Sequence, residues 1–127
     1  MKRIVLCAFF LMAGVSTQVS ALCMYMTHNY SGIVAGKTDV TAYGPFAITD
    51  SNGCSQASIN AKIEAAGSGS PPEIYIDRLQ GSAWVQVAGS SVNKNPSHVG
   101  PLGTYRIRVK NDSTDGKAYG GNIRYGR

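Results

Sequence analysis

The segment ASINAKIEA, residues 57–65, decides the fold class because apolar and polar side chains alternate along it without a break. Such alternation gives an extended strand one dry face and one wet face, as in a half-buried antiparallel sheet. Ala, Lys and Glu also favour helices, but apolar residues in strict alternation favour the strand. The segment YRIRVK, 105–110, alternates in the same way. Two shorter alternating runs, 74–77 and 84–87, flank the turn residues 80–82 and predict a hairpin.

Three weaker runs complete the predicted strands, at 23–30, 38–49 and 119–125. The pair Gly120-Gly121 predicts a β-bulge in the last run, and residues 89–101 are predicted as one long loop. Roughly seven or eight short strands separated by turn residues predict an all-β fold, a small single-domain antiparallel β-sandwich. A length of 127 residues leaves no room for a two-domain enzyme.

The first 21 residues have the composition of a cleaved secretory signal peptide. Residues 2–3 are basic, residues 4–15 are apolar, and residues 19–21 (Val-Ser-Ala) match a small-x-small cleavage site. The apolar stretch is too short to span about 30 Å of hydrocarbon comfortably, and an uncleaved anchor is the alternative. We therefore expect one β-sandwich domain at residues 22–127, secreted or periplasmic.

Cleavage would leave an even pair of cysteines, Cys23 and Cys54, because Cys7 is lost with the signal peptide. In an oxidising compartment this pair is predicted to form a disulfide, with two free thiols as the alternative. Loss of Lys2 and Arg3 reduces the basic residues from 12 to 10 against 7 acidic ones, so the net charge falls from +5 to +3. The exported domain is therefore mildly basic.

The residues offer little catalytic chemistry. The sequence has no G-x-S-x-G elbow and no C-x-x-C or paired-histidine spacing, so no catalytic residue, metal or cofactor is predicted. One arrangement stays open, because His28 and His98 with a nearby cation could cleave RNA if the fold brings them together. Residues 111–116 (NDSTDG) are similar to the start of a calcium loop, but Asn122 stands where a bidentate Glu is expected. A simple Asp-Gly turn is the alternative.

The basic residues near the C-terminus are the first candidate binding residues. Arg106, Arg108 and Lys110 lie on one face of a predicted strand, and Arg124 follows in the next one. Such a face would attract an anionic envelope polymer, an acidic glycan or an acidic protein surface. Nucleic acid also fits electrostatically, but export makes it an unlikely partner. The alternative is that these cations only keep the strand face solvated and block edge pairing.

Two aromatic residues are the second candidate. Tyr75 and Trp84 alternate with the aliphatic side chains of their runs. If the aliphatic side chains face the core, the two rings are exposed, and they could be cross-strand neighbours that stack on sugars or anchor a protein partner. The alternative is that both rings belong to the core, since a small sandwich needs its only Trp.

The segment Pro101-Leu102-Gly103-Thr104-Tyr105, with the alternating strand after it and the final strand to Tyr125, resembles the end of secreted β-sandwich modules of the pre-peptidase C-terminal type. The resemblance covers about the last half of the chain. It implies an accessory binding module without catalytic residues.

Pilus and spore-coat subunits are a second comparison, suggested by the early disulfide and by Tyr125 near the end of the chain. Subunits that donate a strand to a neighbour need a free N-terminal extension. Here Cys23 would be the second residue after cleavage, so no free strand would precede the bridge. The position of Cys23 therefore argues against donor-strand assembly.

These features predict an exported, non-catalytic binding protein. Its expected partner is an anionic or glycan component of the cell envelope, or a protein outside the cell. The alternative is a small secreted toxin or antagonist, or an inhibitor or immunity partner of one, because small size, export and a disulfide also fit that class.

Overall fold

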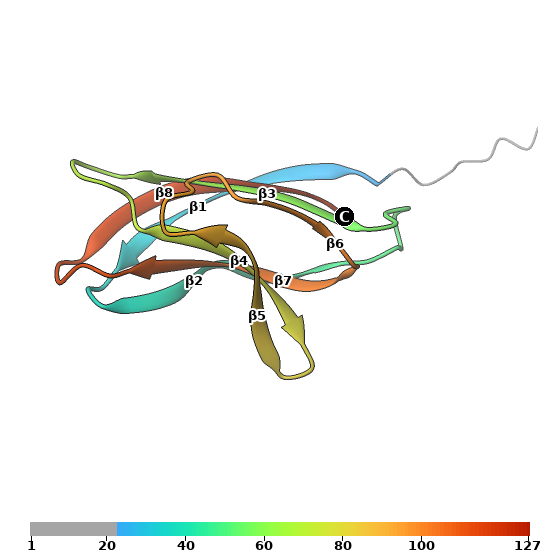
Figure 1. The fold of residues 1–127 in the computed structure, drawn as a ribbon. Helices are drawn as coiled ribbons and strands as arrows, with labels where there is room; N and C mark the ends of the chain where they lie inside the picture. Colours follow the sequence, from blue (N-terminus) through green and yellow to red (C-terminus); the bar gives the residue numbers. More distant parts are fainter. Residues whose placement is uncertain (1–22) are drawn as a thin grey trace, which may run out of the picture.

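The computed structural model describes residues 23–127, and the predicted signal peptide, residues 1–21, lies outside them. The described chain is an antiparallel β-sandwich, as predicted, with eight strands in two four-stranded sheets (Figure 1). The strand orders are β1-β8-β3-β6 and β2-β7-β4-β5. No helix among these residues is long and apolar enough to cross a membrane. The strands are β1 Tyr25–Val34, β2 Thr38–Ile48, β3 Ala57–Ala65, β4 Glu73–Gln80, β5 Ala83–Ser90, β6 Ser97–Gly100, β7 Gly103–Asn111 and β8 Lys117–Gly126.

The two sheets are held together by the apolar side chains that alternate inward. Ile59 and Ile63 of β3 belong to the same buried cluster as Ile107 of β7. Tyr43 on β2 and Tyr125 on β8 add a hydrogen bond between the sheets, with 3.0 Å between their hydroxyl oxygens. Burial of these side chains is the main favourable contribution to folding. The alternation read from the sequence is therefore the alternation that builds the core.

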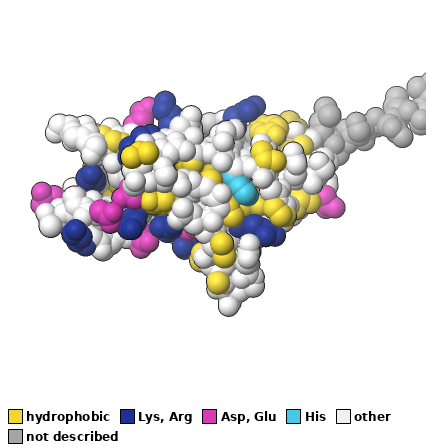
Figure 2. Space-filling view, in the orientation of Figure 1, with side chains coloured by type: hydrophobic (Ala, Val, Ile, Leu, Met, Phe, Trp, Pro, Cys, Tyr) yellow, Lys and Arg dark blue, Asp and Glu magenta, His cyan; other side chains and the backbone are white. Residues whose placement is uncertain are grey.

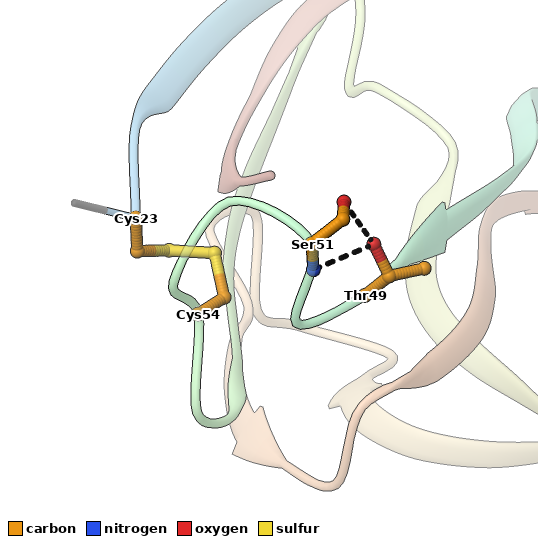
Figure 3. Close-up of a disulfide and its surroundings, with 4 residues drawn as sticks. All are labelled: Cys23, Thr49, Ser51 and Cys54. Carbon is orange, nitrogen blue, oxygen red and sulfur yellow. Dashed lines mark hydrogen bonds between the residues drawn. A yellow bond between two sulfur atoms is a disulfide. The ribbon is translucent and has the colours of Figure 1, made fainter. Parts of the chain in front are cut away.

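The predicted disulfide joins Cys23, just before β1, to Cys54, in the loop before β3 (Figure 3). In the chain-entropy model, a bridge across 31 residues stabilises the fold by roughly 3–4 kcal/mol. The loop that carries Cys54 is also ordered locally, since the hydroxyl oxygens of Thr49 and Ser51 lie 2.8 Å apart. Disulfides persist in oxidising compartments, so the Cys23–Cys54 bridge is consistent with an extracellular protein.

The loop predicted at residues 89–101 is wrong in part, because residues 97–100 form β6. Four residues are too few to show alternation, so the sequence pattern gave no signal. β6 covers the side of β3 that β8 leaves free, with Ile59 opposite His98. The N–H of Ala61 also donates to the carbonyl of Pro96 at 3.0 Å. The pairing thus satisfies backbone groups of β3 that would otherwise lack partners.

The predicted bulge at Gly120-Gly121 is also wrong. β8 keeps one register with β1 and with β3 through both glycines. Position 121 requires glycine because there is no room for a side chain. A Cβ there would overlap the carbonyl oxygen of Lys62 and approach the ring of Tyr30 to 2.8 Å. The Tyr30 hydroxyl donates to that same Lys62 oxygen at 2.5 Å. Gly121 therefore lets the Tyr30 ring cross β8.

We predict that Gly121→Ala lowers the free energy of unfolding by about 1–3 kcal/mol, the usual cost of overpacking a close-packed site. Gly120→Ala is the matched control, because the nearest atom to a Cβ there is a backbone oxygen at 3.9 Å. Urea denaturation of both variants measures the difference. Equal stability of the two variants would contradict this role of Gly121.

Candidate functional site

The outer face of the β2-β7-β4-β5 sheet carries most of the side chains predicted to bind a ligand. β7 turns Tyr105, Ile107 and Val109 into the core, where none is exposed. The cations that alternate with them therefore point outward, as predicted. Five of the six predicted residues lie on this face: Tyr75, Trp84, Arg106, Arg108 and Lys110.

The centre of this face is a buried carboxylate that the sequence analysis missed. Asp77 on β4 is only 2% exposed. Its Oδ2 accepts hydrogen bonds from the Nε of Arg106 at 2.9 Å and from the Nε of Arg108 at 2.8 Å. Arg108 also donates to Asp39 at 3.4 Å and to Gln86 at 3.2 Å. Burial opposes the charge of Arg108, but its hydrogen bonds to Asp77 and the nearby negative charges of Asp77 and Asp39 together raise its pKa.

Each of the two arginines also lies over an aromatic ring. The guanidinium carbon of Arg106 is 4.5 Å from the centre of the Trp84 ring, and that of Arg108 is 4.6 Å from the centre of the Tyr75 ring. These are cation–π distances. We call this cluster the arginine–aromatic face. Its members are Tyr75, Asp77, Trp84, Arg106 and Arg108.

The two aromatic residues correspond to neither alternative drawn from the sequence. Tyr75 is only 8% exposed, but it is covered on the outer face by Arg108 rather than buried between the sheets. Its hydroxyl donates to Glu73, and burial together with this bond raises the Tyr75 pKa to about 12. Trp84 is half-buried and lies opposite Leu79, whereas Tyr75 lies opposite Gly89, so the two are not direct cross-strand neighbours. Tyr75 has no ring face open for stacking on a sugar.

The expected excess of positive charge on this face is largely neutralised. Arg106 and Arg108 are paired with Asp77, and Lys110 lies 3.7 Å from Asp112 in an exposed pair. Asp39 adds a further acidic group beside Arg108. Figure 2, which views the sandwich from the side, shows basic and acidic side chains interspersed along it. The acidic partners come from other strands and turns, which a count along the chain does not reveal.

Arg124 does not join the other predicted residues. It lies on β8, in the other sheet, where its cross-strand neighbours are Thr27 and Asn60. Its guanidinium carbon is 4.6 Å from the centre of the Tyr25 ring. The proximity of Arg124 to Lys110 in sequence was misleading, because the chain changes sheets between β7 and β8.

The histidines and the calcium-like turn do not form the sites considered from the sequence. His28 is on β1 and His98 is on β6, at opposite edges of one sheet, so the two-histidine arrangement is not formed. The Asn111 amide nitrogen donates to the carbonyl of Asp115 at 2.7 Å, and its oxygen accepts from the N–H of Ser113 at 2.9 Å. Asn111 therefore orders the turn. Within residues 23–127 no group of three or more His, Cys, Asp or Glu side chains could hold a metal ion.

A second polar feature lies at the end of the sandwich where β6 and β7 meet. The Nε2 of His98 and the Nε of Arg78 are buried without a hydrogen-bond partner among the described residues. The His98 ring packs 5.7 Å from the ring of Tyr105, whose hydroxyl donates to the carbonyl of Pro101. Burial, and then the nearby charge of Arg78, lower the His98 pKa.

The fold is similar to that of a solved structure described as the Yersinia pseudotuberculosis-derived mitogen. The two chains are 17% identical over 81% of this chain and 86% of the mitogen, with a TM-score of 0.55, so the likeness concerns the fold alone. A chain of the Bacillus endospore appendages, described as disulfide-linked pili, aligns over 98% of both chains at 14% identity, but its TM-score of 0.36 is too low to indicate a common fold. No family model and no curated protein matches, so the resemblance to pre-peptidase C-terminal modules stays a prediction.

We predict that Asp77→Asn lowers the free energy of unfolding by about 2–3 kcal/mol, because it removes the buried counter-charge that the two partly buried guanidinium groups share. Asp112→Asn is the control, because the side chains of Asp112 and Lys110 are 63% and 43% exposed. Their ion pair should therefore contribute less than about 1 kcal/mol. Urea denaturation at neutral pH distinguishes them. A similar loss of unfolding free energy in both variants would contradict the stabilising role assigned to the buried Asp77 carboxylate.

We predict that stability falls as the pH is lowered below the unfolded-state pKa of His98, about 6.5. The folded state holds His98 at a lower pKa, so its stabilising contribution is complete above that pH and is lost as the pH falls through the folded value. His98→Gln should show a weaker pH dependence of the unfolding free energy than the parent chain between about pH 8 and pH 5. An unchanged pH dependence in His98→Gln would contradict the assignment.

Proposed function

We propose that this chain is an exported, non-catalytic binding protein that docks a protein partner through the arginine–aromatic face. The observation that carries this proposal is the fixed geometry of Arg106 and Arg108, each held between Asp77 and an aromatic ring. Trp, Tyr and Arg supply most of the binding energy in protein interfaces. Side chains already fixed in place lose little conformational entropy when a partner binds.

The charges on this face favour a protein over an anionic polymer. A polyanion binds most strongly to cationic side chains that have no acidic partner. Here it would compete with Asp77 and Asp39 for the same guanidinium groups. A glycan binds best to an aromatic ring whose face is exposed for stacking, but the Tyr75 ring is covered by Arg108. A protein partner that carries charges of both signs and an apolar group in contact with Trp84 would be more complementary to the exposed groups of this face.

Three further observations support export and binding rather than catalysis. Residues 1–21 have the pattern of a cleaved signal peptide, and the disulfide between Cys23 and Cys54 is typical of oxidising compartments. The titratable residues that could have formed a catalytic pair, His28 and His98, lie at opposite sheet edges. Secretion with one preformed interaction face is a coherent description of these features.

The second candidate function is a small secreted antagonist or toxin. One observation favours it, which is that a protein described as a mitogen has a similar fold. Under this hypothesis the same face would engage a protein on a target cell. Proliferation or death of cultured cells after addition of the purified chain would support this reading.

We predict that the chain lacking residues 1–21 is retained on envelope preparations in a protease-sensitive manner that changes little between low and high salt. Trp84→Ala should weaken retention at least about tenfold, as expected for an interface anchor. Lys62→Ala is the control, because Lys62 is exposed on the opposite sheet. Trp84 is a better probe than charge reversal at Arg106 or Arg108, which would also leave Asp77 uncompensated.

The same assay should include wall polymers and anionic liposomes. Retention on these anionic materials that disappears at high salt, together with no effect of Trp84→Ala, would overturn the protein-partner proposal. That result would favour an anionic envelope component.

A further inference from the structure

β1 is an outer strand that lacks the usual protection of an exposed sheet edge. Among the strands that the structure describes, its ten residues pair only with β8, in one unbroken register. It contains no Lys, Arg, Asp, Glu or Pro. Natural sheets usually protect their edges with charges, prolines, bulges or short strands. β1 has none of these.

The other three outer strands each carry such a device. β2 contains Asp39 and Pro45, and its register with β7 shifts twice. β5 has a register shift against β4, and β6 has only four residues. The unprotected edge is therefore particular to β1 among the described strands.

The backbone groups that β1 leaves unpaired can be identified. The N–H of Arg127 donates to the carbonyl of Met24 at 2.8 Å, which continues the ladder between β1 and β8. Backbone hydrogen bonding alternates from residue to residue along an antiparallel pair. The even-numbered residues of β1 therefore direct their N–H and C=O groups toward β8, and the odd-numbered residues direct theirs toward the free edge. The odd-numbered side chains are all exposed: Tyr25, Thr27, Asn29, Ser31 and Ile33.

We propose that a second copy of this chain pairs with β1 in antiparallel orientation, about a two-fold axis at Asn29. In this register Asn29 faces Asn29, Thr27 faces Ser31, and Tyr25 faces Ile33 of the second copy. Tyr25 and Ile33 are 44% and 76% exposed, and the pairing covers both. No like charges meet at the axis, because the strand carries no Lys, Arg, Asp or Glu.

The register is set by the positions of the two large apolar side chains. They lie at equal distances from Asn29, so the two-fold operation brings each against the other. A shift of two residues in either direction would place Tyr25 against Ala35, or Ile33 against Cys23, and both of these lie outside β1. The proposed register is thus the one that pairs the exposed apolar groups while keeping all partners within the strand.

Sedimentation velocity over a range of concentrations tests the proposal. The purified chain lacking residues 1–21, which retains all eight strands and the disulfide, should show a monomer–dimer equilibrium. Asn29→Lys places two like charges at the axis and should raise the dimer dissociation constant at least about tenfold. Asn60→Lys is the matched control, because Asn60 is exposed on the same outer face but on an inner strand, and it should leave the equilibrium unchanged.

A charge exchange tests the register. Tyr25→Glu and Ile33→Lys should each weaken the dimer, and the double variant should restore it by pairing opposite charges between copies. The two positions are eight residues apart along one strand, about 26 Å, so the pair cannot form within one chain. Circular dichroism confirms that each variant is folded.

Three outcomes would overturn the proposal. These are a parent chain that stays monomeric up to about 500 µM, a dissociation constant unaffected by Asn29→Lys, or a double variant as weak as the single variants.

Discussion

The carboxylate of Asp77 is the constraint on which the β2-β7-β4-β5 sheet depends. A carboxylate that is 2% exposed costs several kcal/mol unless nearby groups compensate its charge. Compensation comes from Arg106 and Arg108, which reach it because Asp77 and Arg106 are direct partners in the β4–β7 register. The guanidinium groups in turn lie over rings on β4 and β5, and Arg108 also reaches Asp39 on β2. One buried acid thus connects all four strands and holds the face rigid.

The sequence predicted the parts of the fold that depend on local alternation. Residues 57–65 and 105–110 show period two over enough positions to identify both the strands and their inward faces, and their observed bounds agree closely. Two features lay beyond this reasoning for different reasons. β6 is too short to have a period, and the need for Gly121 comes from Tyr30 and Lys62, which reach it from other strands. Contacts between distant segments decide these features, so a local pattern cannot contain them.

The candidate site was harder to predict because charges were read along the chain rather than across the sheets. The count near the C-terminus found the cations, but their partners Asp39 and Asp77 lie 69 and 29 residues away from the arginines they contact. The same reading joined Arg124 to the cluster, although it belongs to the other sheet. A basic run in one strand of a sandwich indicates little about net surface charge until the register of its neighbours is known.

The proposed dimer bears directly on how the arginine–aromatic face would act. An antiparallel pair of strands is related by a two-fold axis normal to the sheet, so the β1-β8-β3-β6 sheets of both copies would join edge to edge. Their inner faces would then lie on the same side, with a β2-β7-β4-β5 sheet packed beneath each. Both arginine–aromatic faces would consequently point in the same direction. A face with few anchoring side chains binds one partner only modestly, but two such faces on one rigid body gain avidity of about 10²–10⁴ on a surface that displays the partner repeatedly. An envelope or a cell surface is such a target, whereas a dilute soluble protein is not.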